Sequence, residues 1–324
     1  MGVLRNEVPT QNSWLNPEST ECSTTPFATM RNKNDQSAAD LKGPHASLII
    51  SVYKNATYLD CILNALQYQT FKSYEVIVSE DGQDKQIQEV LEPYLISNKH
   101  IRHLTQPDDG FRKNRALNRA INASTTDCLI FIDGDCVPHS RFIESHVRHS
   151  NTTQINAGRR VELGHQFSQK LVQTPSLIEN FSNSRLYSFM LPRLILDQIK
   201  NPESGYYSKL AHHFSRQRPL SLVGCNFSTS RKALYEINGF NEDYEAPGIG
   251  EDTDVEWRFL RAGYRVSNIK FLTPLFHLWH PRSYSFSEQN KQIYEATKSQ
   301  DQWYTPHGLV VNRPNCDPAS RTAK

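Results

Sequence analysis

The stretch LIFIDGDCVP, residues 129–138, is an apolar run that ends in two carboxylates, Asp133 and Asp135. Two unpaired negative charges at the end of a buried strand repel each other and resist removal from water. A divalent cation held between the carboxylates and a diphosphate would compensate that charge, because Mg²⁺ and Mn²⁺ bind carboxylate and phosphate oxygens. Gly134 would let the backbone turn and let a nucleotide approach closely. The alternative is an ordinary turn at a strand end, with both acids in water.

Strands and helices alternate around this stretch. Apolar runs typical of buried strands occur at 47–53, 74–82, 101–106 and 127–135, and helical spacing of apolar residues occurs at 57–69, 85–95 and 114–124. Each predicted strand is apolar on both faces, as in a parallel sheet covered by helices on both sides. We therefore predict an α/β fold with a Rossmann-like, mostly parallel central sheet.

Ligands of such sheets bind beyond the carboxyl ends of the strands. Residues 51–53, 80–82 and 133–135 all lie at such ends, so three distant segments are predicted to meet at one crevice. Asp81 could accept hydrogen bonds there from a nucleobase or a ribose. On its own, Asp81 could equally be a turn acid.

Basic residues open the third predicted helix. The segment GFRKNR, residues 110–115, places Arg112, Lys113 and Arg115 where cations and free backbone N–H groups suit a pyrophosphate. A solvated basic turn is the alternative.

A second acidic group follows a glycine-rich loop. In GIGEDTDVEWR, residues 248–258, Glu251, Asp252 and Asp254 stand at the start of a predicted helix. These carboxylates could simply cap that helix. A carboxylate there could also take the proton of an attacking sugar hydroxyl as a general base.

Two imidazoles stand three residues apart in HLWHP, residues 277–281. In a regular strand His277 and His280 would face opposite ways. Both can bind one ion only if the chain bends near Trp279, and Pro281 indicates that the strand does not continue. Buried, hydrogen-bonded histidines are the rival interpretation.

Composition excludes several classes of protein. The 324 residues carry a net charge of only +2, so the overall charge does not indicate binding to nucleic acid or to an anionic membrane. No run of about 18 apolar residues and no signal-peptide segment occurs. Six cysteines without a C-x-x-C pair indicate a reducing compartment. We expect a cytoplasmic protein, either free in solution or peripheral at the inner face of the plasma membrane.

The rest of the chain is patterned more weakly. Residues 161–219 mix aromatics, arginines and leucines at roughly helical spacing and predict a helical excursion outside the sheet. Compact patterning returns from Leu220, where we predict a strand at 220–230, helices at 231–239 and 251–263, and strands at 264–269 and 271–280. Residues 1–45 and 286–324 predict a disordered leader and a polar C-terminal tail.

Together these motifs resemble a known family. SLIISVYKN, QTFKSYEVIVSEDG and LIFIDGDCVP, in this order, resemble the family-2 glycosyltransferases of the GT-A fold. VGCNFSTSRKALYEINGFNEDYEAPGIGEDTDVEWR, with HLWHPR after it, resembles the metal- and acceptor-binding end of the β-1,4-galactosyltransferases and their bacterial relatives. The resemblance covers roughly residues 46–160 and 220–285.

The resemblance implies a GT-A domain at 46–285, with a nucleotide-sugar-binding half at 46–160 and an acceptor- and metal-binding half at 220–285. It also implies an inverting, metal-dependent hexosyltransferase. Such an enzyme would move a hexose or N-acetylhexosamine from a UDP-sugar to a hydroxyl of a glycan or glycolipid. Bacterial surface polysaccharide or lipopolysaccharide synthesis is the implied process, and Mn²⁺ (or Mg²⁺) the implied cofactor.

Carried over by position, the resemblance assigns the donor site. Asp81 would contact the uracil, Arg112 or Arg115 would hold the diphosphate, and Asp133 would contact the ribose or the metal. The whole implied nucleotide-sugar site comprises Ser51, Val52, Tyr53, Asp81, Arg112, Arg115, Asp133 and Gly134.

The resemblance also assigns the metal and acceptor sites. Asp135 would bind the metal, Asp252 would be the catalytic base, and Glu251 and Asp254 would orient the acceptor. The galactosyltransferases complete the metal site with a Met-x-x-His pair, which His277 and His280 replace here. The tryptophans of the family's acceptor loop are replaced by EAPGIG, so the acceptor can differ.

Two other functions are compatible with parts of the sequence. A nucleotidyltransferase also uses acidic metal ligands on an α/β sheet, but it normally carries a glycine-rich, basic phosphate loop after its first strand, and SVYKNATY is not one. A non-catalytic carbohydrate-binding protein would not need intact acidic motifs. Residues 165–218 could receive a glycan or a lipid-linked acceptor at a membrane surface, or could serve packing alone.

Overall fold

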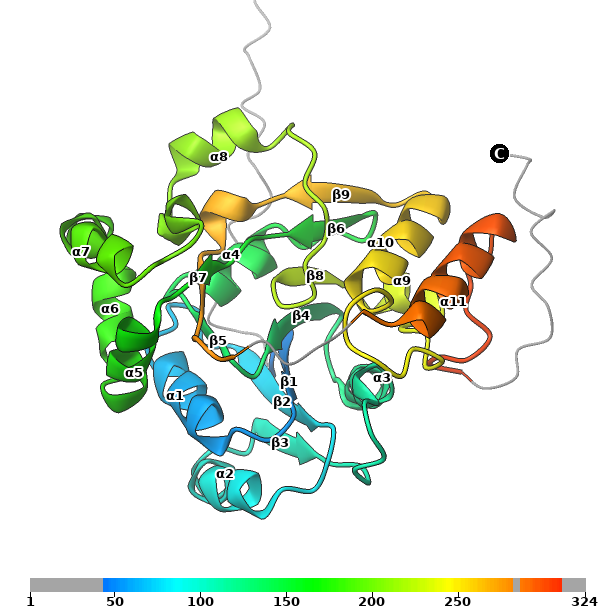
Figure 1. Ribbon diagram of the computed structural model, residues 1–324, viewed down its shortest axis with the longest axis horizontal. Helices are drawn as coiled ribbons and strands as arrows, with labels where there is room; N and C mark the ends of the chain where they lie inside the picture. The colour runs from blue at the N-terminus through cyan, green and yellow to red at the C-terminus, as the bar shows by residue number, and fades with distance from the viewer. Residues whose placement is uncertain (1–42, 282–285, 311–324) are drawn as a thin grey trace, which may run out of the picture. The chain divides into compact units, whose positions relative to one another are not determined.

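A seven-stranded sheet runs through the part of the chain that the computed structural model describes, residues 43–281 and 286–310 (Figure 1). Its strands lie in the order β3-β2-β1-β4-β8-β6-β9. They are β1 (Ala46–Val52), β2 (Tyr74–Glu80), β3 (Ile101–Leu104), β4 (Cys128–Asp133), β6 (Gln154–Ala157), β8 (Phe227–Ser230) and β9 (Arg265–Asn268). Residues 1–42 of the predicted leader lie outside the described residues.

The first four strands form the predicted parallel half of the sheet. β1 lies between β2 and β4, with Ile49 opposite Ile77 and Ser51 opposite Asp133. β8 then pairs antiparallel to both β4 and β6, and β6 pairs parallel to β9. The prediction of a mostly parallel sheet is confirmed. Only the end of the predicted strand 220–230 is extended, because the residues before β8 form a loop.

Helices cover both faces of this sheet. Leu48 and Ile50 of β1 face one core, whereas Ile49 between them faces the other. One core is closed by helices that include α1 (Ala56–Leu66), α2 (Lys85–Ser97) and α5 (His165–Gln173). The other is closed by α3 (Lys113–Ala123), α9 (Arg231–Glu236) and α10 (Asp252–Arg261). The helices along the sheet are α1 (Ala56–Leu66), α2 (Lys85–Ser97), α3 (Lys113–Ala123), α4 (Phe142–Arg148), α9 (Arg231–Glu236) and α10 (Asp252–Arg261).

A second, three-stranded sheet has the order β5-β10-β7. It comprises β5 (Cys136–Pro138), β7 (Val161–Glu162) and β10 (Leu275–His277). In this sheet His277 lies opposite Cys136 and also opposite Glu162. Three segments that are far apart in the sequence therefore meet beside the end of β4.

The segment 161–219 is mainly helical and stands to one side of the sheets (Figure 1). It contains α5 (His165–Gln173), α6 (Leu177–Phe181), α7 (Ser184–Leu196), the 3-10 helix η1 (Pro202–Gly205) and α8 (Lys209–Ser215). A further 3-10 helix, η2, spans Lys270–Leu272. Buried Phe181, Tyr187 and Leu194 anchor α6 and α7 on the core.

One helix lies where the sequence predicted only a polar tail. α11 spans Glu288–Ser299, and the hydroxyl of Ser287 caps it by accepting a hydrogen bond from the backbone N–H of Asn290. Its residues buried on the body of the protein are polar, namely Asn290 and Thr297. A helix that docks through polar residues lacks the apolar stripe on which such predictions depend.

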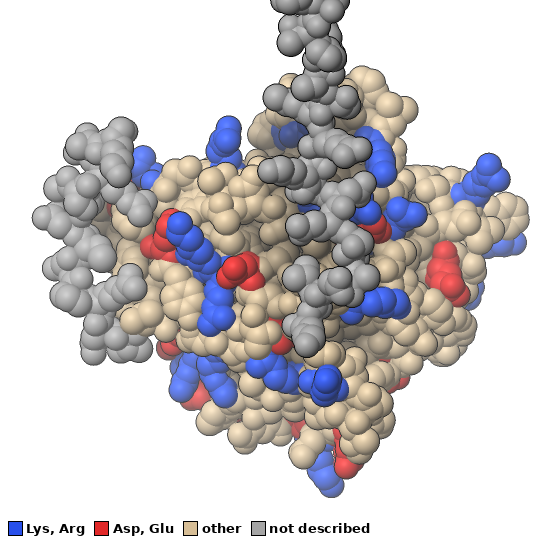
Figure 2. Space-filling model, turned by 180° about the vertical axis from the view of Figure 1, so that it is seen from behind, with Lys and Arg blue, Asp and Glu red and all other residues tan. Residues whose placement is uncertain are grey.

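The surface carries charges of both signs. On the face seen in Figure 2, Lys and Arg side chains are interspersed with Asp and Glu, as the net charge of +2 leads one to expect. Within residues 43–281 and 286–310, every helix is too short or too polar to span a bilayer. The described cysteines are unpaired and buried: Cys61, Cys128, Cys136 and Cys225.

Candidate active site

Two adjoining cavities open at the carboxyl ends of β1, β2 and β4. The smaller has a volume of about 460 Å³ and the larger about 780 Å³. Ser51, Val52, Tyr53 and Asp81 line the smaller cavity, and Asp252 lines the larger. Both cavities are lined by Lys113, Asp133, Asp135, Pro247, Glu251 and His280.

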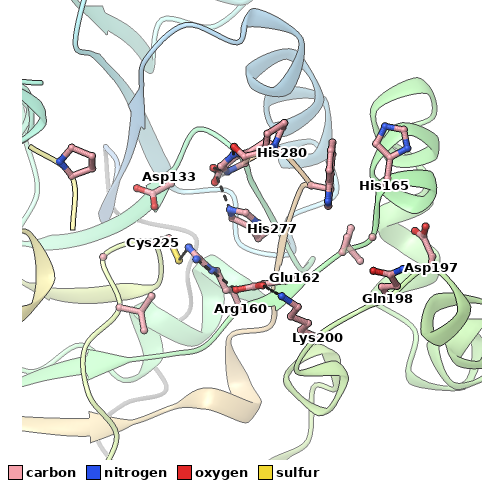
Figure 3. A pocket seen from close by; sticks show the side chains of 18 of the residues that line it. Asp133, Arg160, Glu162, His165, Asp197, Gln198, Lys200, Cys225, His277 and His280 are labelled. Carbon is pink, nitrogen blue, oxygen red and sulfur yellow. Dashed lines mark hydrogen bonds and ion pairs between the residues drawn. The ribbon is translucent and has the colours of Figure 1, made fainter. Parts of the chain in front are cut away.

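Asp135, His277 and His280 form a three-residue cluster at the junction of the cavities. Figure 3 shows the two histidines close to each other. Oδ2 of Asp135 lies 3.3 Å from Nε2 of His277 and 3.1 Å from Nε2 of His280. The predicted bend exists, because β10 ends at His277 and the N–H of Leu278 then donates to the carbonyl of Asp135 at 2.8 Å. Both imidazoles can therefore face one carboxylate.

The cluster has the composition of a metal site. One ligand atom from each of its three residues lies within 4.8 Å of the others. A carboxylate oxygen suits Mg²⁺ and Mn²⁺, whereas imidazole nitrogen suits transition metals. The donor set therefore fits Mn²⁺ better than Mg²⁺.

Both imidazoles of this cluster lie within hydrogen-bond distance of Asp135. Burial opposes ionisation of Asp135, but hydrogen bonds from His277 and His280 outweigh it and keep the pKa of Asp135 well below its usual range. The hydrogen bond to Asp135 also raises the pKa of His280. Hydrogen bonding to the imidazoles thus favours the ionised form of Asp135.

Asp133 has a different partner, Lys113. The Nζ atom of Lys113 lies 2.9 Å from Oδ1 of Asp133 and 2.7 Å from Oε2 of Glu251. Burial alone would lower the pKa of Lys113, but the two carboxylates outweigh it and raise that pKa well above its usual value. Burial raises the pKa of Glu251. Asp133 and Asp135, two residues apart in the sequence, therefore have different partners: Lys113 for Asp133, and the two histidines for Asp135.

Asp252 and Asp254 stand two residues apart on α10 in opposite environments. Asp252 is the first residue of the helix, lines the larger cavity, and accepts a hydrogen bond of 3.1 Å from the N–H of Gly224. Asp254 is fully buried, with Oδ2 2.7 Å from Nε of Arg258 and Oδ1 3.1 Å from the hydroxyl of Tyr244. A carboxylate enclosed in this way cannot touch an acceptor, so the predicted role of Asp254 does not fit the structure.

Gly250 explains the shape of the loop before Asp252. Its φ of +118° lies in the region that favours glycine, and an added Cβ would lie 2.0 Å from the ring of Tyr244. The loop EAPGIG, residues 245–250, is thus held by this glycine against a buried tyrosine. Gly134 is tight for a similar reason, because a Cβ there would lie 3.0 Å from the carbonyl oxygen of Ser51.

Asp81 lines the smaller cavity. Its carboxylate is buried and accepts hydrogen bonds from Nε2 of Gln106 at 2.8 Å and from the N–H of Arg112 at 2.7 Å. Each carboxylate oxygen can accept a further hydrogen bond. Asp81 can therefore still recognise a donor group of a ligand in this cavity.

The predicted arginines do not line either cavity. The guanidinium of Arg112 points to Glu245 and Asp109, at 3.3 and 3.5 Å, and Arg115 is exposed on α3. Lys113, between them, faces both cavities instead. The motif GFRKNR therefore lies beside the cavities, but the sequence did not single out the lysine as the residue that faces them.

The sequence did not predict which residues form the side of the larger cavity that segment 161–219 and its border contribute. Figure 3 shows Arg160, Glu162 and Lys200 between the histidine cluster and Gln198. Arg160 and Lys200 lie 3.8 and 3.7 Å from Glu162. These residues belong to the weakly patterned segment 161–219 and its border, where no motif signals them.

Trp279, which lies between the two histidines in the sequence, lines the same cavity. Its side chain is 41% exposed. The backbone N–H of Trp279 donates to Oγ of Ser168 at 2.8 Å, and its backbone carbonyl accepts from the hydroxyl of Tyr58 at 2.6 Å. His165 meets its ring edge-on at 4.7 Å between centroids. The sequence identified Trp279 only as the place of the bend.

Two family profiles match the chain. The profile described as "Glycosyl transferase family 2" matches residues 47–236, which is more than half of the 324 residues. The profile described as "N-terminal domain of galactosyltransferase" matches residues 206–281. The second match includes Asp252 and both clustered histidines.

Individual relatives agree with these profiles. A hyaluronan synthase of Pasteurella multocida is 23% identical over 231 residues, which are 67% of this chain and 23% of that protein. Glycosyltransferase AglE of Haloferax volcanii is 31% identical over 122 residues, which are 37% of this chain and 40% of that protein. The chain thus spans less than half the length of either relative.

A solved structure shares the fold. The crystal structure of GalNAc-T7 with UDP, GalNAc and Mn²⁺ superimposes with a TM-score of 0.53 at 11% identity, over 80% of this chain and 49% of that chain. The predicted GT-A fold is confirmed by this similarity together with the sheet order. On these matches the chain belongs to glycosyl transferase family 2.

Proposed function

We propose that this protein is an inverting hexosyltransferase that moves a hexose or an N-acetylhexosamine from a UDP-sugar to a hydroxyl of a glycan or glycolipid. The observation that carries the proposal is the position of the cluster of Asp135, His277 and His280 between two cavities. A donor nucleotide and an acceptor would occupy opposite sides of that cluster.

The smaller cavity suits the nucleotide. Ser51, Val52 and Tyr53 offer backbone groups along one wall, and Asp81 can accept a hydrogen bond from the N3–H of uracil. The exposed ring of Tyr53, 51% accessible, could stack on the base. These features support a uridine nucleotide as donor.

The junction of the cavities suits the diphosphate. Asp135, His277 and His280 would hold Mn²⁺ there, and a bound cation neutralises charge on a departing diphosphate. Lys113 already holds Asp133 and Glu251 and adds a positive charge within the same junction. Lys113 would therefore help to orient the diphosphate and to balance its charge.

Asp252 is the proposed catalytic base. Its Oδ2 is oriented by the N–H of Gly224, and its carboxylate faces the larger cavity. It would take the proton from the acceptor hydroxyl as that oxygen attacks the anomeric carbon, while the bond from that carbon to the diphosphate breaks. Attack from the face opposite the leaving group inverts the anomeric centre.

Trp279 is the proposed platform for the acceptor. Its backbone is fixed by hydrogen bonds with Ser168 and Tyr58, so its half-exposed ring is held rigidly in the larger cavity. A rigid aromatic surface beside a few polar groups suits the apolar face of a pyranose. The acceptor residue is therefore proposed to be a sugar, and a surface polysaccharide or lipopolysaccharide is the proposed product.

The test compares the wild type with Asp252→Asn on a panel of UDP-sugars with Mn²⁺. Wild type should release UDP in the presence of a glycan acceptor, and Asp252→Asn should reduce transfer by about a thousandfold because the proton has no acceptor. Calorimetric affinity for the UDP-sugar should be unchanged in the variant. Normal transfer by Asp252→Asn would refute the assignment. Formation of a UDP-sugar and pyrophosphate from UTP and a sugar 1-phosphate, without transfer from a UDP-sugar, would indicate a nucleotidyltransferase.

A further inference from the structure

Exposed apolar side chains gather on two neighbouring segments, α7 and α8. Twelve large apolar side chains are exposed among the described residues, and six of them lie between residues 186 and 214. Phe189 is 73% accessible, Leu196 84% and Phe214 71%. Such a concentration on a soluble domain marks a contact surface rather than chance exposure.

On α7 these side chains form a stripe together with arginines. Arg185, Phe189, Arg193 and Leu196 are spaced four, four and three residues apart, which places them on one side of a helix. The guanidinium of Arg193 lies 5.9 Å from the ring centroid of Phe189. The opposite side of the helix is anchored in the core. We call this outward stripe, together with the exposed Ile195 beside Leu196, the α7 face.

The segment around the α7 face is basic. Residues 184–218 contain six Lys or Arg and two acids, although the whole chain has a net charge of only +2. Both acids are engaged, because Asp197 accepts hydrogen bonds from the N–H groups of Gln166 and Phe167, and Glu203 pairs with Lys270 at 2.8 Å. Six basic and two acidic residues leave this segment with a net charge of +4, although Lys200 is paired with Glu162 at 3.7 Å.

The α7 face ends at the larger cavity. Leu196, its last residue, lines that cavity together with Gln198 and Lys200. Gln198 and Lys200 lie on the side of the cavity away from Asp133 (Figure 3), which is the proposed acceptor side. α7 itself is an outermost element in Figure 1. An acceptor that enters past Leu196 would thus arrive along the α7 face.

We propose that the α7 face binds the surface of an anionic lipid bilayer and that the acceptor is a sugar linked to a lipid of that bilayer. Exposed Phe, Ile and Leu side chains would enter the interface between headgroups and acyl chains, while arginines contact anionic headgroups. The identity of the acceptor rests on the function proposed above, whereas membrane binding does not. α7 would lie on the membrane without crossing it.

The test is co-sedimentation of the full-length protein with vesicles of phosphatidylcholine, with and without phosphatidylglycerol. The wild type should bind vesicles that contain phosphatidylglycerol, and added salt should weaken that binding. Phe189→Ser with Ile195→Ser should lower the partition coefficient by at least about tenfold, because the exposed apolar area is lost. Arg185→Glu with Arg193→Glu should lower it by a similar factor.

Matched controls lie on other surfaces. Ile96→Ser with Leu260→Ser removes side chains of 80% and 50% accessibility, close to the 73% and 58% of Phe189 and Ile195. Lys85→Glu with Lys232→Glu, both exposed, changes the net charge as much as the arginine variant does. Neither control should change the partition coefficient by more than about twofold. Equal losses in the controls would overturn the proposal.

Other outcomes also decide the matter. If the wild type shows no preference for anionic vesicles, the proposal is wrong. If Phe189→Ser with Ile195→Ser instead dissociates a dimer in size-exclusion chromatography, the α7 face is a contact between copies, and the proposal is again wrong. Asp252→Asn should bind vesicles like the wild type. If the wild type itself bound anionic vesicles but transferred no sugar, only the proposed enzymatic function would be rejected.

Discussion

The two walls of the candidate active site, which we name donor-side and acceptor-side after the proposed function, are built in different ways. The donor-side wall comes from the ends of β1, β2 and β4, which are neighbours in one parallel sheet. The acceptor-side wall comes from residues 160–166, 196–200, 223–225 and 277–281, which lie in loops, in a small second sheet and at helix ends. One wall follows from regular strand geometry, whereas the other depends on contacts between distant segments.

This difference teaches where sequence reasoning works. At the end of a parallel strand, a polar residue after an apolar run can be assigned to the ligand-binding edge of the sheet. On the acceptor side no such rule applies, because each residue is positioned by packing of a different segment. The following experiments compare the two walls, from the largest expected effect to the smallest.

Replacing Asp135 should affect both walls at once, because it joins β4 of the donor side to the histidines of the acceptor side. Asp135→Ala should lower transfer by roughly a thousandfold, about 4 kcal/mol of transition-state stabilisation, and should abolish its dependence on Mn²⁺. Kinetics and calorimetric titration of UDP-sugar with and without Mn²⁺ measure both effects. Asp109→Ala, at an exposed acid outside both cavities, is the control. Unchanged Mn²⁺ dependence in Asp135→Ala would remove the metal site from this cluster.

Replacing Asp254 should affect stability rather than either wall. Asp254→Ala leaves the buried guanidinium of Arg258 without its carboxylate and should cost about 3–5 kcal/mol in the free energy of unfolding. Asp252→Asn, two residues away, should change that free energy by less than about 1 kcal/mol. Denaturant unfolding compares the two variants. If Asp254→Ala were as stable as the wild type, the buried ion pair with Arg258 would not explain why Asp254 is excluded from the site.

Replacing Lys113 tests the donor wall where the sequence was only partly informative. Lys113→Met removes two charge-assisted hydrogen bonds and the positive charge near the proposed diphosphate. The KM for the UDP-sugar should rise by about 10- to 100-fold, with a smaller rise in Lys113→Arg. Arg115→Met, exposed on the same helix, should leave the KM unchanged. If Arg115→Met raised the KM for the UDP-sugar and Lys113→Met did not, the assignment of Arg115 to the diphosphate, made from the sequence, would be restored.

Replacing Trp279 tests the acceptor wall by itself. Trp279→Ala should raise the KM for the glycan acceptor by about tenfold, because a rigid aromatic surface is lost. Trp279→Phe should keep part of that affinity. The KM for the UDP-sugar should be the same in all three proteins, as steady-state kinetics with each substrate varied in turn would measure. If Trp279→Ala changed only the KM for the UDP-sugar, Trp279 would belong to the donor-side wall instead.

The sequence by itself determined the parallel half of the sheet and the polar residues at its ligand-binding edge. The apolar runs before Asp81 and Asp133 are local signals, and the strand register then brings such ends together. The pair of histidines was also identified, together with the condition that the chain must bend between them. These predictions succeeded because they depend on residues near one another in the chain.

Only the tertiary structure decided which members of each polar group face the cavities. Residues two apart on a helix point about 200° apart, so Asp252 and Asp254 cannot both line one cavity. The sequence contains that restriction but not the choice between them, because the packing of Tyr244 and Arg258 encloses Asp254. Lys113 is chosen over its neighbouring arginines in the same way. Burial and direction depend on which distant segments pack together, and no local pattern encodes that.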